Sequence, residues 1–157
     1  MYLVFLFKLI IMKAIVQRVK KADLSVDNNL VSEINEGLVV YLGVGKGDTY
    51  EKMQWMAKKV AGLRIFSDEN GKMNLSAKDI KGEILVVSQF TLYGDIKNGY
   101  RPSFIEAEEP TKAKEIYDKF CTELVNLGIT KVGKGIFGAN MTINQTNSGP
   151  VTIILEK

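Results

Sequence analysis

The sequence predicts an α+β fold, a single domain built on a largely antiparallel β-sheet or barrel with two main amphipathic helices. Strand-like runs occur before, between and after two helical segments, and they do not alternate regularly with helices as βαβ units do. The 157 residues are 46% hydrophobic and 25% charged, which suffices for one well-formed core. We therefore divide the chain into an apolar N-terminal extension, residues 1–11, and one domain, residues 12–157.

The N-terminal third predicts a strand, a hairpin and a buried strand. Residues 13–19 alternate around β-branched side chains, and residues 24–26 and 30–34 flank Asp27-Asn28-Asn29, which suits a tight turn. Residues 38–44 form a continuous apolar run between Gly37 and Gly45. The run is typical of a strand covered on both faces.

Two helices and a central strand follow. The first helix is expected to begin near Asp48, with Glu51 placed for a capping box, and to bury Met53, Met56, Val60 and Leu63. Residues 83–87 predict a strand that leads directly to Ser88. The second helix, residues 111–127, carries an apolar stripe and stops at Gly128. Residues 141–145 and 151–155 predict two final strands around a break.

Composition excludes several kinds of chemistry. The chain contains no histidine, so Ser-His-Asp and Cys-His sites are excluded. The single cysteine, Cys121, lies beside the apolar stripe of the second helix and predicts a small buried side chain. A net charge of +3 permits contact with polyanions but lacks dense basic clusters. We expect a cytoplasmic protein, because nothing indicates an oxidised, secreted fold.

The apolar start of the chain allows two interpretations. Residues 1–12 are too short for the roughly 20 residues of a membrane-spanning helix, and they lack a basic leader and a cleavage site. We interpret residues 1–11 as an extension upstream of Met12. The alternative is a short membrane or partner anchor.

Three glycine-rich or acidic segments resemble functional motifs without matching them. Residues 128–134 imitate a phosphate-binding loop, but Gly135 stands where a Ser or Thr is needed, and a helix precedes the segment instead of a strand. Residues 43–47 lack dinucleotide-loop spacing. Glu108-Glu109 lies in a polar loop, where solvation is the simpler interpretation.

The segment Ser88-Gln89-Phe90-Thr91 is the first candidate site. It follows a buried strand and carries two hydroxyls, an amide and an aromatic ring. One interpretation is a strand end whose Ser and Thr satisfy backbone groups. The other is an oxyanion site, where the N–H of Gln89 or Phe90 faces the charge that develops on an ester carbonyl.

Four separated motifs resemble the D-aminoacyl-tRNA deacylase (D-Tyr-tRNA deacylase) family. They are S-Q-F-T-L-Y-G-D (88–95), G-Y-R-P-S-F (99–104), F-G-A-N-M (137–141) and N-S-G-P-V-T (147–152). The segments M-K-A-I-V-Q-R-V (12–19) and R-I-F-S-D-E-N-G-K-M-N-L (64–75) fit as well. The resemblance covers the chain from Met12 to its end.

The resemblance implies an activity and a selection device. The family hydrolyses the ester of D-aminoacyl-tRNA, and its Gly-Pro pair is a cis peptide that each subunit of a homodimer inserts into the other's active site. Here that pair is Gly149-Pro150. A rigid backbone on one side of Cα leaves no room for an L side chain, so selection is by exclusion. Glycine lacks a side chain, and some hydrolysis of Gly-tRNA is expected.

The resemblance also assigns roles to residues. Ser88, Gln89 and Phe90 line the pocket, with the Phe90 N–H as a carbonyl donor. Older interpretations of the family would make Thr91 the nucleophile, but a side-chain hydroxyl needs an activating base to attack an ester. We favour water, assisted by the ribose 2′-OH, with Thr91 as a positioning residue.

Further residues are placed around this pocket by the resemblance. Phe137, Gly138 and Ala139 lie near the 3′-terminal adenosine, and Met141 lies near the inserted loop; hydrophobic packing also explains Phe137 and Met141. Arg18 holds the Gly-Pro loop, or else is a solvated strand arginine. Ser148 stands where the family often has an acidic residue.

No cofactor or metal is expected, and neither is a membrane or DNA partner. Two alternatives remain open. One is an RNA-binding module without catalysis, supported by the basic composition and by aromatics near cations, such as Tyr100-Arg101 and Phe137 with Lys134. The other is a Ser or Thr hydrolase of small esters, which the missing base disfavours.

Overall fold

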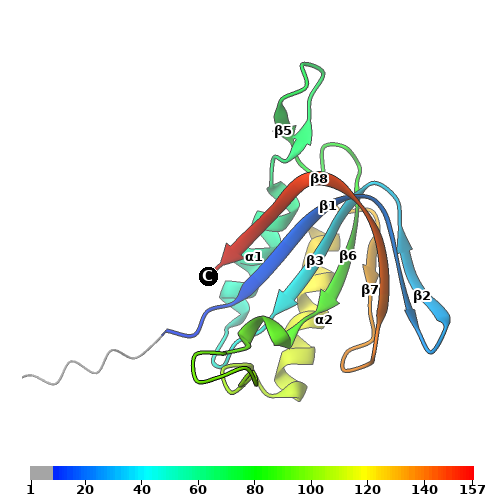
Figure 1. The fold of residues 1–157 in the computed structure, drawn as a ribbon. Helices are drawn as coiled ribbons and strands as arrows, with labels where there is room; N and C mark the ends of the chain where they lie inside the picture. Colours follow the sequence, from blue (N-terminus) through cyan, green and yellow to red (C-terminus); the bar gives the residue numbers. More distant parts are fainter. Residues whose placement is uncertain (1–8) are drawn as a thin grey trace, which may run out of the picture.

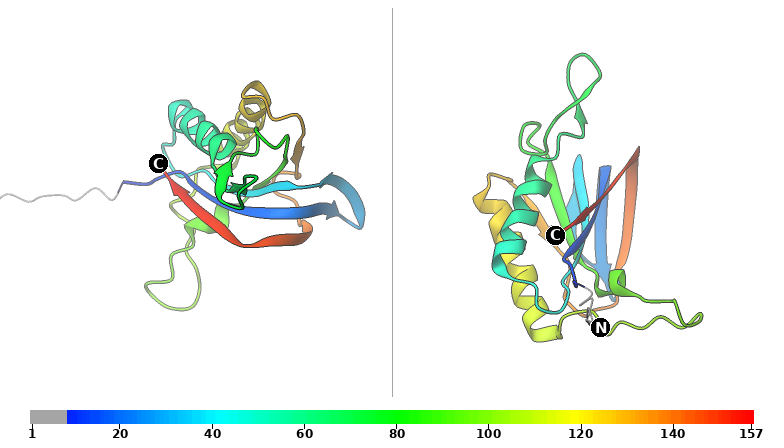
Figure 2. Two further views of the ribbon diagram at one scale, coloured as in Figure 1. Left: turned by 90° about the horizontal axis from the view of Figure 1, so that it is seen from above. Right: turned by 90° about the vertical axis from the view of Figure 1, so that its left-hand side faces the viewer.

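A computed structural model describes residues 9–157 (Figure 1). Within these residues, a strongly curled six-stranded sheet carries two α-helices on one face, as predicted (Figures 1 and 2). A second, two-stranded sheet projects from one end. The elements are β1 Lys13–Val26, β2 Asn29–Ile34, β3 Gly37–Gly43, α1 Tyr50–Gly62, β4 Phe66–Ser67, β5 Met73–Leu75, β6 Glu83–Ser88, the 3₁₀ turn η1 Phe90–Tyr93, α2 Pro110–Asn126, β7 Val132–Lys134 and β8 Thr142–Glu156.

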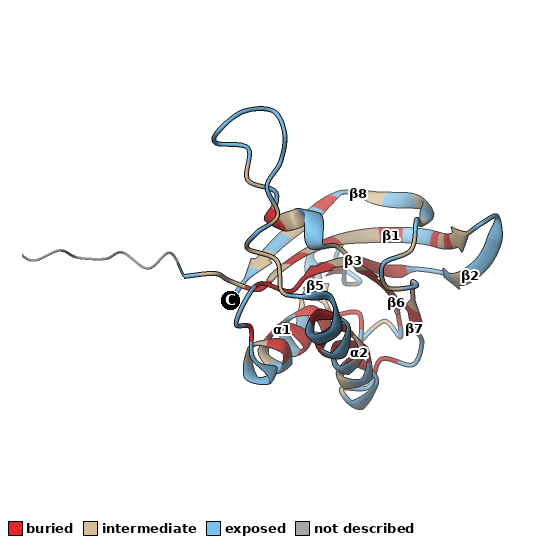
Figure 3. Cartoon of the chain, turned by 90° about the horizontal axis from the view of Figure 1, so that it is seen from below, coloured by how far each residue is buried: buried red, intermediate tan, exposed pale blue. Residues whose placement is uncertain are grey.

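Strand alternation divides the interior into two cores. On β3, Leu38, Val40 and Leu42 face the helices, whereas Val39 and Tyr41 face the inside of the curled sheet. The helix-facing core includes Tyr117 and Phe120 of α2, and Figure 3 shows buried positions on the helix sides that face the sheet. In the second core, Leu85 and Val87 of β6 pack with β1, and Met141 and Ile143 lie against them. The sheet therefore approaches a barrel.

The pairing is mostly antiparallel, with two parallel exceptions. β1 pairs antiparallel with β2, β3 and β8, while β3–β6 and β6–β7 are parallel. The β1–β2 hairpin turns at Asp27 and Asn28, whose φ angles of 50° and 62° are the positive values that a type I′ turn requires. The predicted hairpin is confirmed.

The last strand differs from the prediction of two strands around a break. β8 is one strand that runs through Gly149-Pro150, and the break survives as a bulge. Gln17 pairs with Thr152 and Val19 with Asn147, so only Arg18 on β1 opposes residues 148–151 on β8. A proline cannot donate to the ladder, which explains why it lies in the bulge.

Helix α1 begins later than predicted. Its N-cap is Thr49, whose hydroxyl accepts a hydrogen bond from the Lys52 N–H (3.3 Å), and not Asp48. The Asp48 carboxylate turns back and accepts from the Gly45 N–H (2.6 Å). The β4–β5 hairpin was not predicted, because its strands are only two and three residues long.

The expected extension, residues 1–11, lies mostly outside the described residues. Of its described part, Leu9 is exposed, whereas Ile10 and Ile11 are partly buried. Within residues 9–157, no helix is long and apolar enough to span a membrane.

Candidate active site

The candidate site begins where β6 ends. The Gln89 N–H extends the pairing with β3 by donating to the Leu42 carbonyl (2.8 Å), and the chain then tightens into η1. Turn bonds from Leu92 to Gln89 and from Gly94 to Thr91 close η1. The first N–H groups of a helical turn have no acceptor within the turn, so the Phe90 N–H is not used by the hydrogen bonds that close η1. The Gln89 N–H is already bonded, which leaves Phe90 as the candidate oxyanion donor.

Two distant segments of the chain meet at this point. Ser88, Gln89 and Phe90 form one wall of a pocket of about 300 Å³, and residues 137–141 form the facing wall. Val87 and Ile143 complete its lining. The structure thus brings together the residues assigned to the ester, those assigned to the terminal adenosine, and Met141, which was assigned to the inserted loop.

A second pocket, of about 470 Å³, shares Ser88, Phe90 and the Phe137-Gly138 pair with the first. It extends to Phe104, Ile105 and the start of α2. The Phe90 and Phe104 rings meet edge to face, with centroids 5.2 Å apart. The sequence did not predict this pocket, because its remaining lining combines core residues such as Val44 and Ala113 with loop residues such as Lys46 and Glu109, which come from separate segments.

Thr91 lies at the exposed side of the turn. Its hydroxyl accepts a hydrogen bond from the Gln89 side-chain amide, and it lines neither pocket. A hydroxyl engaged in this way, without a base beside it, suits a positioning residue better than a nucleophile.

Tyr117 of α2 holds the wall formed by residues 137–141. Its hydroxyl donates to the Val86 carbonyl (2.8 Å) and accepts from the Gly135 N–H (3.2 Å), joining β6 to the loop before Phe137. The Tyr117 and Phe137 rings lie 6.2 Å apart. Burial raises the pKa of Tyr117 well above its usual value, so this phenol stays protonated.

The same helix buries the single thiol. Burial raises the pKa of Cys121 to about 12, and its sulfur lies in the helix-facing core. The thiolate needed for nucleophilic attack is therefore almost unpopulated at neutral pH.

The Gly-Pro pair lies elsewhere in the same chain. The Gly149-Pro150 bond is cis, both residues are exposed, and neither lines either pocket. Gly149 follows the pocket residue Met141 by eight positions along β8, a separation of roughly 20 Å at about 3.3 Å per residue. Figure 1 shows the middle of β8 at the end of the sheet opposite η1.

Arg18 stands opposite the bulge. Its Nε donates to the Ser148 carbonyl (3.0 Å), and Nη1 donates to the Ile65 carbonyl (2.6 Å). The side chain is partly buried by these contacts, which argues against a freely solvated arginine.

Glu108 and Glu109 have structural partners that the sequence did not reveal. Glu108 accepts from the Gly47 N–H (2.9 Å) and pairs with Lys112, and Glu109 caps α2. In residues 9–157, no three His, Cys, Asp or Glu side chains gather closely enough to hold a metal ion.

Comparison with known proteins decides the family. The sequence model described as "D-Tyr-tRNA(Tyr) deacylase" matches residues 15–156. The chain belongs to the D-Tyr-tRNA(Tyr) deacylase family. The resemblance seen in the four motifs is therefore confirmed, and so is the prediction of an enzyme.

Two curated relatives and a solved structure are similar to this chain over most of its length. A D-aminoacyl-tRNA deacylase of Aquifex aeolicus is 57% identical over 145 residues, covering 92% of this chain and 97% of the relative. One of Thermotoga petrophila is 55% identical over the same coverage. The solved "c-Myc DNA Unwinding Element Binding Protein" is 39% identical, with a TM-score of 0.87 over 92% of this chain and 98% of that one. The predicted fold class is confirmed by this match.

Proposed function

We propose that this protein hydrolyses the ester bond of D-aminoacyl-tRNA in the cytoplasm, releasing the D-amino acid and free tRNA. The observation that carries the proposal is the pocket where Ser88-Gln89-Phe90 meets residues 137–141. It is formed by two of the family's motifs in a chain 57% identical to a named D-aminoacyl-tRNA deacylase.

The proposed reaction uses water as the nucleophile. The water oxygen bonds to the ester carbonyl carbon, and the negative charge that develops on the carbonyl oxygen is stabilised by the Phe90 N–H. The bond from that carbon to the ribose oxygen then breaks, and the ribose oxygen receives a proton derived from the water. With no histidine in the chain, the neighbouring ribose 2′-OH is the group proposed to orient the water.

Chirality is proposed to be read by a second subunit. Because Gly149-Pro150 lies far from the pocket of its own chain, it can act at a pocket only in another copy, within a homodimer. The Gly149 carbonyl would meet the substrate's α-amino group, and the backbone would fill the space that an L side chain needs. The exposure of this pair and its bracing by Arg18 support the proposal.

Selection by exclusion limits what the pocket can reject. A D side chain points outward and makes few contacts, so many D-amino acids are accepted. Glycine offers nothing to exclude, so hydrolysis of Gly-tRNA is the expected weakness of the device. The pocket beside it, with Phe104 and the Phe137-Gly138 pair, leaves space for the terminal nucleoside.

The test is a deacylation time course with matched D-Tyr-tRNA and L-Tyr-tRNA, with and without EDTA. We expect rapid loss of the D-ester alone, and the same rate with EDTA. Equal stability of both esters, with tRNA still bound, would instead favour nucleic-acid binding without catalysis. Comparable turnover of simple p-nitrophenyl esters would favour a general esterase.

A further inference from the structure

Tyr93 closes the turn that carries the candidate site. It is the last residue of η1 and only 3% exposed, although Phe90 at the other end of the turn is 56% exposed. Its ring packs against the backbone at the end of β3 and in the loop that follows it. A Cβ added to Gly43 would stand 2.9 Å from the Tyr93 ring, and one added to Gly45 would stand 3.1 Å from it. These two glycines are therefore needed to seat the ring.

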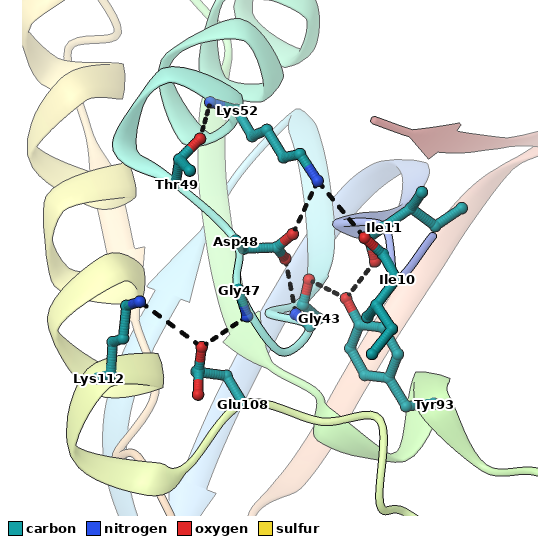
Figure 4. Close-up of polar contacts among 11 residues, drawn as sticks. Ile10, Ile11, Gly43, Gly47, Asp48, Thr49, Lys52, Tyr93, Glu108 and Lys112 are labelled. Atoms are coloured by element: carbon teal, nitrogen blue, oxygen red, sulfur yellow. Dashed lines mark hydrogen bonds and ion pairs between the residues drawn. The ribbon is translucent and has the colours of Figure 1, made fainter. Parts of the chain in front are cut away.

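The Tyr93 hydroxyl reaches two backbone carbonyls from different parts of the chain. Its oxygen lies 2.9 Å from the Gly43 carbonyl and 2.7 Å from the Ile11 carbonyl (Figure 4). A phenol has one proton, which these two acceptors share. Burial raises the Tyr93 pKa, so the hydroxyl remains a donor at any ordinary pH.

The segment that supplies the second carbonyl is itself fastened. Lys52 of α1 donates to the Ile10 carbonyl (3.4 Å) and pairs with the buried Asp48 carboxylate (3.4 Å), which accepts from the Gly45 N–H (Figure 4). The Met12 N–H donates to the Lys157 carbonyl (2.9 Å). Ile10 and Ile11 precede residue 15, where the match to the family begins.

We infer that Tyr93 is a positioning residue for the reaction, and that the Ile10-Ile11 segment of this chain helps to hold it. The inference rests on the proposed function. η1 is one short turn, so anchoring Tyr93 at its end sets the direction of the Phe90 N–H at its start. A misplacement of about 1 Å at such a donor can cost about 100-fold in rate.

The direct test is Tyr93→Phe, which removes the hydroxyl and keeps the ring. We expect kcat on D-Tyr-tRNA to fall about tenfold with KM nearly unchanged. The pocket stays intact, and only the direction of the Phe90 N–H becomes less well fixed. Tyr50→Phe is the matched control, since its hydroxyl contacts Glu115 on the helices, away from η1. An unchanged kcat, or equal losses in the two variants, would overturn the inference.

A second pair of variants tests the packing around the Tyr93 ring without changing Tyr93 itself. In Gly45→Ala, the new Cβ would also meet the Ile10 side chain at 2.6 Å and the Ile11 carbonyl at 3.1 Å, displacing both sides of the contact. Gly62→Ala adds the same methyl to open space at the end of α1. We expect only Gly45→Ala to lower kcat.

Hydrogen–deuterium exchange gives a readout independent of activity. Both Tyr93→Phe and Gly45→Ala should speed exchange in the peptide covering residues 88–94, without change in α2. If exchange there is unaltered, the anchoring role is wrong whatever the kinetics show. If the wild-type protein hydrolyses no D-ester, the proposed function fails, while the exchange result still decides whether Tyr93 holds the turn.

Discussion

Arg18 donates from Nε to the carbonyl oxygen of Ser148 at 3.0 Å, one residue before Gly149. Its Nη1 donates to the Ile65 carbonyl at 2.6 Å, so one guanidinium links the β8 bulge to the segment before β4. Since the bulge interrupts the β1–β8 ladder at this point, the side chain replaces pairing that the backbone cannot supply. These contacts predict that Arg18 fixes the direction of Gly149-Pro150.

Replacing Arg18 should weaken activity through the bulge. In Arg18→Met, loss of charged hydrogen bonds worth about 1.5–3 kcal/mol should lower kcat/KM for D-Tyr-tRNA about tenfold or more. Lys20→Met is the control, because Lys20 is an exposed cation on the same strand. Equal activity of the two variants in a steady-state assay would show that the arginine does not orient the pair.

Thr91→Val distinguishes positioning from nucleophilic attack. If Thr91 only holds the Gln89 amide, activity should fall no more than about tenfold, the scale of one hydrogen bond. Single-turnover assays with labelled aminoacyl ester, followed by mass spectrometry of the protein, measure both rate and covalent intermediate. Loss of nearly all activity in a folded variant, with an acyl-enzyme trapped in the wild type, would identify Thr91 as the nucleophile.

Tyr117→Phe should destabilise the protein and loosen one pocket wall. The variant leaves the Val86 carbonyl and the Gly135 N–H without their partner, which costs about 1–3 kcal/mol of unfolding free energy. Urea unfolding measures the loss, and KM for D-Tyr-tRNA should rise because the loop before Phe137 is released. A variant as stable as the wild type would contradict the role of this hydroxyl.

The buried thiol of Cys121 should make the folded protein less stable at alkaline pH. Burial raises the thiol pKa from 9.0 to about 12, so between these values the unfolded chain releases a proton that the folded chain keeps. The thiol's contribution is complete below pH 9 and disappears as pH rises toward 12, at up to about 1.4 kcal/mol per pH unit. Urea unfolding from pH 7 to pH 11 should show a shallower decline in Cys121→Ala than in the wild type. If the unfolding free energy declines equally in the two proteins, the pKa of Cys121 is not raised by folding.

The same pKa predicts a protected thiol. At pH 8 we expect iodoacetamide to leave the folded protein active and unmodified, because thiolate is scarce and the sulfur is buried. Modification in urea is the positive control.

Local patterns predicted most of the elements correctly. The alternation in residues 13–19, the Asp27-Asn28 turn and the two apolar helix stripes act over a few residues, and the structure forms them where expected. The N-cap of α1 was predicted one residue too early, because both Asp48 and Thr49 have side chains that can cap a helix N-terminus. Asp48 instead bonds Gly45, in a loop whose path depends on Tyr93 packing from a distant segment.

The sequence predicted which motifs belong to the candidate site, but not how they are arranged in space. Ser88 to Phe90 was a candidate from its position at a strand end, residues 137–141 were assigned through family resemblance, and nothing in either segment alone shows that they meet. The second pocket and the Tyr93 and Tyr117 contacts depend on tertiary packing. Tyr117 belongs to the apolar stripe of the second helix and Tyr93 to a family motif, and neither pattern reveals which carbonyl the tyrosine hydroxyl reaches.

In the proposed dimer, one subunit's Gly149-Pro150 completes the other subunit's pocket. Gly149 has nothing within 4 Å of an added Cβ in its own chain, so Gly149→Leu should fold normally and block only a partner's pocket. Ala139→Trp fills the pocket of its own chain. Each homodimer should be inactive on D-Tyr-tRNA.

The decisive measurement is the activity of the heterodimer of these two variants, co-expressed with different tags and purified through both. One of its two sites combines an open pocket with an intact Gly149, so we predict about half of the wild-type kcat per dimer. A heterodimer as inactive as its parents, or a Gly149→Leu homodimer with full D-selective activity, would contradict the account.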